Sequence, residues 1–418
     1  TLEESLDLGL TTELTKKPDT ALRLVKVSGY TPRVVSGLMA TKERVALALG
    51  TEISGIPDVL QRARRHPSEL EALDKTPQNA PFINNQFDTP DLEAILPLGK
   101  FYPGDGGPYC TAFVVAAHSP NHGMNLSFHR MMHLEKNRFA VRVVKRHLHS
   151  MLSASGGELQ VVAFCGVHPA VLLAAAISAS PDLDELKVAS TLLGGDLPVV
   201  EMVPDIYVPA HSQVVFVGRF TGETTTEGPF VDLTGTYDTI REQPVLEVET
   251  LWMRDNPLYH AILPGGREHK MLMGLPREPS ILDAARSVSP GVQEVNLTQG
   301  GCSWLHAVLQ VEGLAPGQAV NVGLAALGAH ASLKKVTIVD GDIDIRSAED
   351  VEWAEATRVQ PHRDITIIKE ARGSTLDPSR DTQREITSKW IVDATRPPGH
   401  ESHFVRAELP KASSPPKH

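Results

Sequence analysis

The feature that most constrains the fold of this chain is a change of sequence pattern near residue 109. From there to residue 252, runs with period-two alternation or many β-branched residues recur between glycine-rich turns. Such runs are typical of strands that bury one face. They predict five strands, at residues 111–117, 139–144, 159–164, 213–220 and 245–252.

An apolar run at residues 167–179 predicts a helix packed on these strands, because Gly166 precedes the run and Pro169 lies near its first turn. Several strands with a packed helix favour a barrel-like β domain. The mouth of such a barrel is a suitable place for a planar cofactor.

The regions on either side of these strands show mixed helix and strand patterns, which predict α/β layers. With 418 residues, the chain is long enough for two or three domains. We expect short strands or strand-helix joints near residues 22–27 and 33–39, and an amphipathic helical stretch at 57–74. We expect later helices at 280–288 and 319–327, and later strands at 306–310 and 335–339.

These patterns divide the chain into an N-terminal α/β region, a strand-rich middle domain, a C-terminal α/β domain and a tail. The last segment is polar and proline-rich, so we expect it to be disordered. The predicted boundaries are 1–98, 99–275, 276–410 and 411–418.

Charge and cysteine content exclude several classes of protein. The net charge of -11 disfavours nonspecific attraction to nucleic acid or anionic lipid, so any bound phosphate needs a local site. The most apolar window, 170–179, is too short to span a bilayer, and the first residues lack the pattern of a secretory signal. The three widely spaced cysteines, Cys110, Cys165 and Cys302, predict small buried residues in a reducing cytoplasm.

Two carboxylates, Glu227 and Asp232, flank the pair Gly228-Pro229, which does not continue a helix. Two acids held rigidly at this spacing suit proton transfer at one reacting centre. Arg130 is a basic residue that can keep one of them ionised. Glu-Gly-Pro also occurs in ordinary surface turns, so this pattern alone leaves both interpretations open.

A second set, Asn125, His147 and Glu185, combines an amide, an imidazole and a carboxylate. Such oxygen and nitrogen ligands suit manganese or magnesium, although an isolated histidine is more often solvated or hydrogen-bonded. The basic run at 142–149 is typical of a solvated strand end, and Arg146 within it is an alternative anion contact.

Other chemical signatures are absent from the sequence. Asp340, Asp342 and Asp344 lack the glycine and glutamate of an EF-hand loop and follow a predicted strand, so they favour a helix cap or a subunit contact. No glycine-rich run matches a dinucleotide or P-loop fingerprint, and no Gly-x-Ser-x-Gly motif is present.

Taken in order, several of these segments resemble the UbiD family of reversible decarboxylases, which use prenylated flavin mononucleotide. The similarity covers most of the chain from about residue 100 onward. It is carried by Asn125 to Arg130, Arg146-His147, Asp184-Glu185-Leu186, Glu227 to Gly235, Val339 to Asp344, Asp350 to Ala354 and Ser388 to Thr395.

The resemblance implies a central split β-barrel that binds the flavin, between N-terminal and C-terminal α/β regions, the latter involved in oligomerisation. It implies that Asn125, His147 and Glu185 hold a divalent metal, commonly manganese, at the cofactor phosphate, with a potassium ion nearby. It further implies that Glu227, Arg130 and Asp232 form the catalytic network. The remaining cofactor contacts that it implies are Thr111, Arg146 and Lys389, beside Arg130 and the metal ligands.

The resemblance leaves the substrate open among aromatic, heteroaromatic and α,β-unsaturated acids. Val231 stands where many relatives carry glycine, and the short chain is similar to a bacterial and archaeal branch. That branch includes furandicarboxylate decarboxylases and decarboxylases of phosphorylated mevalonate derivatives. A flavin prenyltransferase that supplies the cofactor, and a homodimer or homohexamer, are also implied. The alternatives are a non-catalytic flavin-binding protein and an ordinary FMN oxidoreductase.

Overall fold

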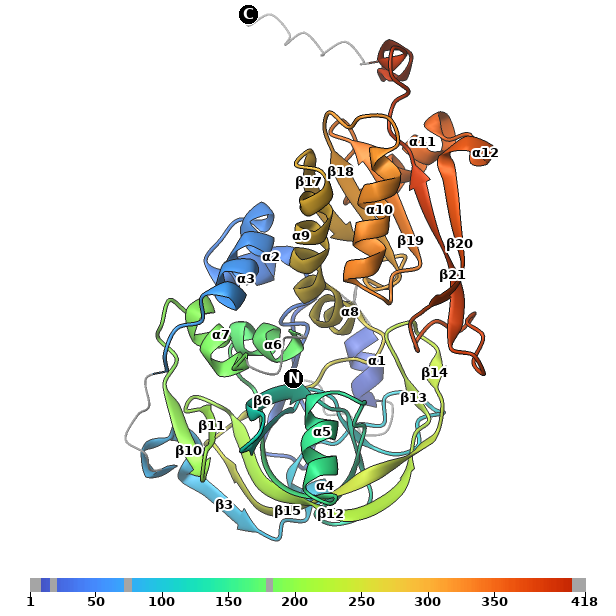
Figure 1. The fold of residues 1–418 in the computed structure, drawn as a ribbon. Helices are drawn as coiled ribbons and strands as arrows, with labels where there is room; N and C mark the ends of the chain where they lie inside the picture. Colours follow the sequence, from blue (N-terminus) through green and yellow to red (C-terminus); the bar gives the residue numbers. More distant parts are fainter. Residues whose placement is uncertain (1–8, 16–20, 71–76, 178–182, 408–418) are drawn as a thin grey trace, which may run out of the picture. The chain divides into compact units, whose positions relative to one another are not determined.

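The computed structural model describes residues 9–15, 21–70, 77–177 and 183–407 (Figure 1). The predicted disordered tail, 411–418, lies outside these residues. The chain divides into two compact units, one within Thr1–Ser280 and Leu376–Pro378 and the other within Ile281–Thr375 and Ser379–His418. Each unit combines helices and strands, so the mixed α+β, multidomain fold that the sequence predicts is confirmed.

A nine-stranded antiparallel sheet forms the centre of the first unit. All five predicted strands are present, with shifted boundaries, and the sheet also contains shorter strands that the sequence did not predict. In spatial order the strands are β4 (Tyr109–Cys110), β7 (Met131–His133), β8 (Arg138–Val141), β15 (Arg241–Met253), β12 (Val214–Glu227), β9 (Glu158–Cys165), β5 (Val114–Ser119) and β6 (Gly123–Phe128), and β3 (Asn85–Asp88) pairs with β15.

The long strands β12 and β15 bend as they cross this sheet (Figure 1). Their pairing shifts register between Val217 and Gly218 and again between Phe220 and Thr224. Register shifts of this kind increase the local bend and twist of a sheet. The sheet does not close, because its end strands β4 and β6 are not paired with each other in the described part of the chain. The predicted central split β-barrel is therefore not confirmed.

Three helices follow or interrupt the strands of this sheet: α5 (His147–Ala154), α6 (Pro169–Ala176) and α7 (Glu185–Leu192). The predicted helix at 167–179 is α6, whose first turn is capped by His168 through a hydrogen bond from the Ala170 amide. Its apolar side chains are buried on nearly every face, so α6 is an internal helix. Both α6 and α7 contact β6.

The N-terminal part of the first unit contributes a small sheet, in which β1 (Arg23–Lys26) and β2 (Arg33–Ser36) form the predicted strands. The later strand β16 (Leu258–His260) joins them parallel to β2. The predicted amphipathic stretch, 57–74, overlaps the helix α3 (Ile56–Arg65), and residues 71–74 of that stretch lie outside the described part. The other elements of this unit are α1 (Gly9–Thr15), α2 (Lys42–Leu49), α4 (Leu92–Ile95), α8 (Arg267–Gly274), the β10–β11 pair (Val199–Val203 and Ile206–Pro209) and the β13–β14 pair (Phe230–Val231 and Tyr237–Asp238).

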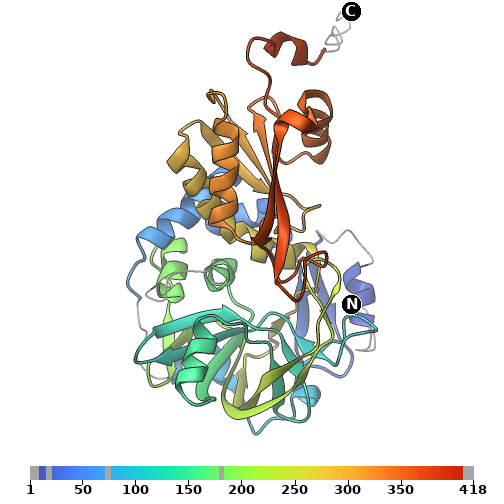
Figure 2. The same cartoon turned by 45° about the vertical axis from the view of Figure 1, so that its right-hand side comes forward.

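The second unit is a five-stranded sheet with helices on its faces, as the C-terminal α/β pattern predicts. Its strands lie in the order β17 (Val292–Leu297), β18 (His306–Val311), β19 (Lys335–Asp340), β21 (Ile386–Asp393) and β20 (Ile365–Arg372), and its helices are α9 (Glu278–Val288), α10 (Gln318–Ala329), α11 (Ala348–Arg358) and α12 (Pro361–Asp364). Figure 2 shows β20 and β21 as a long two-stranded arm.

Side chains alternate between the two faces of this second sheet. Ile338 and Ile391 pack in one core cluster with side chains of α9 and α10, whereas Val339 and Val392 pack in another with Ala354 of α11. This period of two is what strands buried on both faces require. The cap of the following helix α11 is Ser347 and not one of the three predicted aspartates, and Asp340 and Asp342 pair with the buried Arg358. The alternative of a subunit contact stays a prediction.

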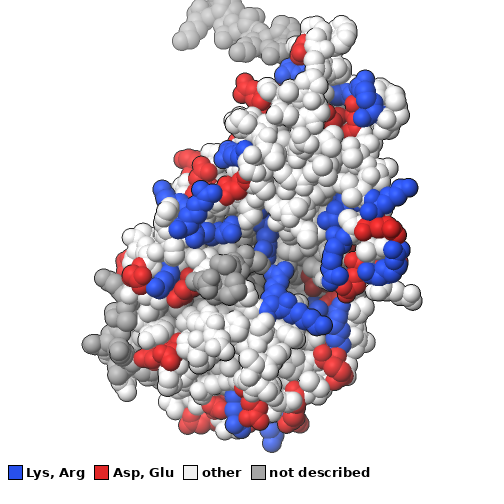
Figure 3. Space-filling view, viewed as in Figure 1, with Lys and Arg blue, Asp and Glu red and all other residues white. Residues whose placement is uncertain are grey.

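The described part of the chain has no helix that is long and apolar enough to cross a membrane. Acidic and basic side chains are interspersed on the face shown in Figure 3, so the net charge of -11 is not spread as a uniform acidic coat on that face. Cys110 and Cys165 are buried as predicted, whereas Cys302 is half-exposed.

A loop before β4 packs directly against the segment that follows β12. The buried side chain of Asp105 accepts hydrogen bonds from the amides of Phe101 and Tyr102, at 3.1 and 2.8 Å. The Gly106 amide donates to the Pro229 carbonyl at 2.8 Å. A Cβ atom at Gly106 would lie 2.2 Å from the Gly228 carbonyl oxygen, so only glycine fits here.

We therefore expect Gly106→Ala to lower the free energy of unfolding by about 1–3 kcal/mol, because the backbone at Gly228 must move away. Urea unfolding of the purified variant measures this loss. Gly328→Ala is the matched control, since a Cβ atom there meets nothing within 4 Å, and it should be neutral or slightly stabilising. Equal stability of Gly106→Ala and the unmodified protein would contradict the close contact.

Candidate active site

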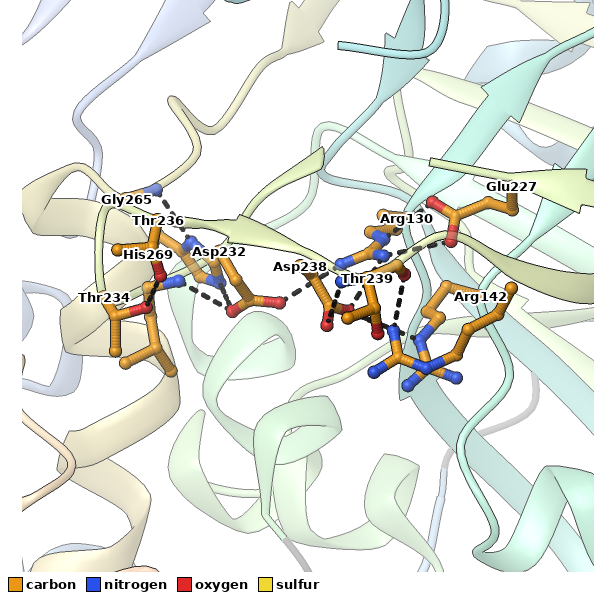
Figure 4. Close-up of polar contacts among 12 residues, drawn as sticks. Arg130, Arg142, Glu227, Asp232, Thr234, Thr236, Asp238, Thr239, Gly265 and His269 are labelled. Atoms are coloured by element: carbon orange, nitrogen blue, oxygen red, sulfur yellow. Dashed lines mark hydrogen bonds and ion pairs between the residues drawn. The ribbon is translucent and has the colours of Figure 1, made fainter. Parts of the chain in front are cut away.

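Arg130 lies at the centre of a group of three carboxylates in the first unit (Figure 4). Its Nε and Nη2 atoms donate to the two oxygens of Glu227, at 2.9 and 3.0 Å. Its Nη1 atom donates to Asp232 Oδ2 and its Nη2 atom to Asp238 Oδ2, both at 3.1 Å. The structure thus brings together the three predicted catalytic residues and adds a fourth, Asp238.

The main sheet and the adjoining β13–β14 pair bring these four side chains together. Arg130 lies in the short link between β6 and β7, and Glu227 is the last residue of β12. Asp232 follows β13, and Asp238 belongs to β14, where it pairs with Phe230 of β13. The two aspartates are therefore held by one short hairpin.

Glu227 is fully buried, and its interactions are those that a buried carboxylate needs. Arg130 holds it with two parallel hydrogen bonds, and the Tyr109 hydroxyl donates to its Oε1 atom at 3.0 Å. Burial, followed by the charge of Glu227, raises the pKa of Tyr109, so this hydroxyl stays a donor. Phe230 lies beneath the guanidinium, with its ring centroid 4.6 Å from Arg130 Cζ. One face of the cation is thus shielded by an aromatic ring.

Asp238 was not predicted, although it is bound by more cations than either predicted acid. It accepts from Arg241 Nη1 at 2.8 Å as well as from Arg130, and Arg142 Nε lies 3.9 Å away. Burial acts to raise the pKa of Asp238, but the hydrogen bond from Arg241 and the charges of Arg130 and Arg241 lower it overall. Asp238 is therefore a stable anion of the site.

Asp232 is more exposed than the other two acids and faces a histidine that was also not predicted. The Leu233 amide donates to Asp232 Oδ1 at 2.7 Å, and His269 Nε2 lies 4.0 Å from the same oxygen. The Gly265 amide donates to His269 Nδ1 at 3.1 Å, so the neutral ring carries its proton on Nε2, toward Asp232. Burial lowers the pKa of His269, which favours this neutral form.

The helix α8 that carries His269 is fixed by the buried residue before it, Glu268. This carboxylate accepts from the amides of Gly37 and Met39, at 2.7 and 2.9 Å, and lies 3.1 Å from His260 Nε2. The N-terminal region is thereby tied to the helix beside Asp232.

Two of the three predicted metal ligands are buried beside β6. Asn125 on this strand donates through Nδ2 to Ser127 Oγ at 3.0 Å, which leaves its Oδ1 atom as a potential ligand. Glu185 opens α7 and accepts from the Leu126 amide at 3.0 Å. Burial raises the pKa of Glu185 to about 8. A buried carboxylate beside an amide oxygen fits a hard divalent cation, which would favour the charged form of Glu185.

The third predicted ligand, His147, is half-exposed at the start of α5, a helix that packs against β6. Among the described residues, no group of three or more His, Cys, Asp and Glu side chains is arranged to hold a metal ion. The predicted set contains only two residues of these types, so its role stays a prediction.

Other surroundings are shown for the remaining predicted cofactor contacts, Thr111, Arg146 and Lys389. Thr111 Oγ1 accepts from the Ile262 amide at 3.0 Å. Arg146 is exposed and precedes α5. Lys389 belongs to β21 of the second unit, where its Nζ atom donates to the Ala331 carbonyl at 2.6 Å and burial lowers its pKa. The cofactor roles of these three residues stay predictions.

His129 links the predicted metal ligands to the arginine group. Its Nε2 atom lies 2.8 Å from Ser127 Oγ, and its Nδ1 atom donates to the Arg142 carbonyl at 2.8 Å. Burial lowers the pKa of His129 from its ordinary 6.5 to about 4. The unfolded chain therefore takes up a proton at a higher pH than the folded protein does.

From this difference we expect the free energy of unfolding to fall by about 3 kcal/mol as the pH drops from 6.5 to 4, because only the unfolded state is protonated in that window. His129→Asn, which keeps a donor for the Arg142 carbonyl, should make this pH dependence shallower. Urea unfolding across the window measures it, with His211→Asn at an exposed position as the control. An unchanged slope in His129→Asn would show that other groups cause the acid sensitivity.

Two family models match the chain, the 3-octaprenyl-4-hydroxybenzoate carboxy-lyase Rift-related domain at residues 74–267 and the C-terminal domain of the same name at residues 270–394. The anhydromevalonate phosphate decarboxylase of Methanocaldococcus jannaschii is 44% identical over 353 residues, which cover 82% of this chain and 83% of that protein.

Solved structures agree with the sequence comparisons. The UbiD-class enzyme HmfF from Pelotomaculum thermopropionicum, in complex with FMN, has a TM-score of 0.92 and 34% identity, covering 98% of this chain and 94% of that chain. An evolved dimeric form of HmfF, in complex with prenylated FMN, has a TM-score of 0.89 and 33% identity, covering 98% and 93%.

Proposed function

We propose a specific reaction for this chain, which belongs to the UbiD family of carboxy-lyases: the decarboxylation of a phosphorylated α,β-unsaturated acid such as anhydromevalonate phosphate. The reaction class, non-oxidative decarboxylation with prenylated FMN, is that of the family. The choice of substrate is supported by the 44% identity to an archaeal enzyme named for it. The observation that carries the proposal is the complete Arg130, Glu227 and Asp232 set, with its hydrogen bonds in place.

Prenylated FMN, when bound, supplies an electron sink for the pair of electrons that carbon dioxide leaves behind. Asn125, Glu185 and His147 would hold a divalent metal at the phosphate of this cofactor. The buried amide oxygen and carboxylate fit that role, because both are oxygen ligands of the kind that a hard divalent cation prefers. Thr111, Arg146 and Lys389 would supply further contacts to it.

Arg130 binds and orients the carboxylate of the substrate in this proposal. Four of its five N–H groups are used by Glu227, Asp232 and Asp238, which leaves one on Nη1. That remaining donor lies on the same nitrogen as the contact to Asp232. A substrate carboxylate bound there is next to the acid that acts on it.

Asp232 provides the proton that replaces the lost carboxylate. The bond between the carboxylate carbon and its neighbour breaks, carbon dioxide leaves, and a proton must reach the vacated carbon. Asp232 is suited to this because it is partly exposed and can regain a proton from solvent, unlike the fully buried Glu227. Glu227 holds the arginine in position.

Several finer features predicted from the sequence or from the family resemblance remain part of this proposal. They are a split β-barrel formed by the main sheet, domain boundaries near residues 98 and 275, manganese or magnesium with potassium, a flavin prenyltransferase as the source of the cofactor, a homo-oligomer and a cytoplasmic location. The strong bend of β12 and β15 supports the first of these.

The two alternative functions, a non-catalytic flavin-binding protein and an ordinary FMN oxidoreductase, would require different residues or cofactors. A non-catalytic flavin-binding protein has no need of a buried arginine that links two acids. An ordinary FMN oxidoreductase would use unmodified flavin with a nicotinamide cofactor, for which the sequence has no fingerprint.

We expect the protein, coexpressed with a flavin prenyltransferase, to release carbon dioxide from anhydromevalonate phosphate. Asp232→Asn should lower this rate at least about 100-fold, because the proton donor is lost, and should keep the flavin spectrum. Carbon dioxide release and flavin absorbance are measured on the same samples, with the exposed Asp255→Asn as a matched control.

Turnover of Asp232→Asn at the unmodified rate would remove Asp232 as the donor. Carbon dioxide release only from furan or benzoate acids would overturn the proposed substrate and keep the reaction class. Oxidation of a nicotinamide cofactor without carbon dioxide release would favour the oxidoreductase.

A further inference from the structure

We propose that Asp238 is a positioning residue that holds Arg130 in place while Asp232 alternates between its charged and neutral forms. The inference rests on the proposed function, because it requires Asp232 to be the proton donor. It starts from the unequal distribution of the three acids around one guanidinium (Figure 4).

Two of the three acids bind Arg130 from one side and the third binds a different nitrogen. Glu227 and Asp238 share Nη2, and Glu227 also takes Nε, whereas Asp232 takes Nη1. Hydrogen bonds between charged partners are about twice as strong as neutral ones. The contact at Nη1 therefore weakens whenever Asp232 carries a proton, and the contacts at Nη2 do not.

Asp238 is itself fixed more firmly than Asp232. Its Oδ1 atom accepts from the Thr239 amide at 2.8 Å, and its Oδ2 atom accepts from Arg241 as well as from Arg130. Its side chain is 7% exposed, compared with 16% for Asp232. Such an environment keeps Asp238 anionic throughout the cycle.

The β13–β14 hairpin connects this anchor to the acid that reacts. Asp238 pairs with Phe230 across the hairpin, the Phe230 ring lies against Arg130, and Asp232 follows two residues later. Asp238 thus joins Arg130 to the hairpin on which Asp232 is carried. When Asp232 is neutral, this link keeps the distance between the arginine and the proton donor.

The charged groups around the two aspartates determine how a substitution at Asp238 changes the pH dependence of activity. Arg130 and His269 face Asp232, from the β6–β7 link and from α8. Arg130, Arg142 and Arg241 face Asp238, and Glu227 lies across Arg130. When the negative charge of Asp238 is removed, less of the positive charge of Arg130 is compensated. Arg130 then favours the charged form of Asp232 more strongly.

Because turnover needs protonated Asp232, Asp238→Asn should lose activity at a lower pH than the unmodified enzyme. We expect the alkaline decline of kcat to move down by about one pH unit and kcat near neutral pH to fall about tenfold, with a smaller change in KM. Arg241→Gln removes a positive charge from Asp238 and should move the decline in the opposite direction. A purely structural role for Asp238 would not give shifts of opposite sign.

The experiment measures carbon dioxide release by flavin-loaded enzyme from anhydromevalonate phosphate between about pH 4 and pH 9, a range that includes the ordinary titration of carboxyl groups at its lower end and that of imidazole groups near its middle. Glu242→Gln is the matched control, because it removes one negative charge from an exposed neighbour of Arg241 that bonds Thr226. Asp238→Glu should restore part of the profile. Flavin absorbance confirms that each variant is loaded.

Opposite shifts in Asp238→Asn and Arg241→Gln, with none in Glu242→Gln, would establish the role. An unshifted profile in Asp238→Asn with reduced kcat would overturn it, as would a change confined to KM. If Asp238→Asn fails to fold, an unshifted profile in Arg241→Gln overturns the inference alone. An unmodified enzyme that releases no carbon dioxide from this acid would instead count against the proposed substrate.

Discussion

The two parallel hydrogen bonds between Arg130 and the fully buried Glu227 are the interaction on which the rest of the site depends. A carboxylate without exposure to water is costly unless a cation and hydrogen bonds compensate its charge. Arg130 and Tyr109 provide that compensation, and Phe230 covers the guanidinium. Once this pair is formed, the direction of the remaining Arg130 donors is fixed, and these donors define where the aspartates can bind.

The surrounding charges are balanced, which explains how so many ionised groups can occupy one partly buried place. Three arginines, Arg130, Arg142 and Arg241, face three acids, Glu227, Asp232 and Asp238. No single member can be removed without leaving an opposite charge uncompensated. These ion pairs hold the hairpin after β12 in place. They also keep several charged groups close to Asp232, the acid proposed to react.

The sequence predicted the central residues of the site but not all of the residues that surround them. Arg130, Glu227 and Asp232 could be found because Glu227 and Asp232 flank a Gly-Pro pair and because the segments resemble a known family. Asp238 could not be found in this way, since its contact with Arg130 depends on the pairing of β13 with β14. The sequence Asp238-x-x-Arg241, with an acid at the end of β14 and a basic residue three positions later at the start of β15, was the available signal. His269 depends on the packing of α8, which no local pattern encodes.

The fold, like the site, has features that local sequence patterns predict and others that depend on contacts between distant residues. Long alternating runs predicted β9, β12 and β15, because burial of one face imposes a period of two. The short strand β6, which carries Asn125, also alternates polar and apolar residues, but it was not among the predicted strands. The order of strands, and therefore the open ends of the main sheet, depends on pairings between residues far apart in sequence.

The most direct test of the central interaction is the rate of carbon dioxide release by flavin-loaded Arg130→Lys. Lysine keeps the positive charge but is a point charge that cannot form two parallel bonds to Glu227 while it also binds both aspartates. We predict that this variant retains the flavin and loses activity at least about 100-fold. Activity close to that of the unmodified enzyme would contradict the account, because charge alone, without the planar fork of Arg130, would then be sufficient.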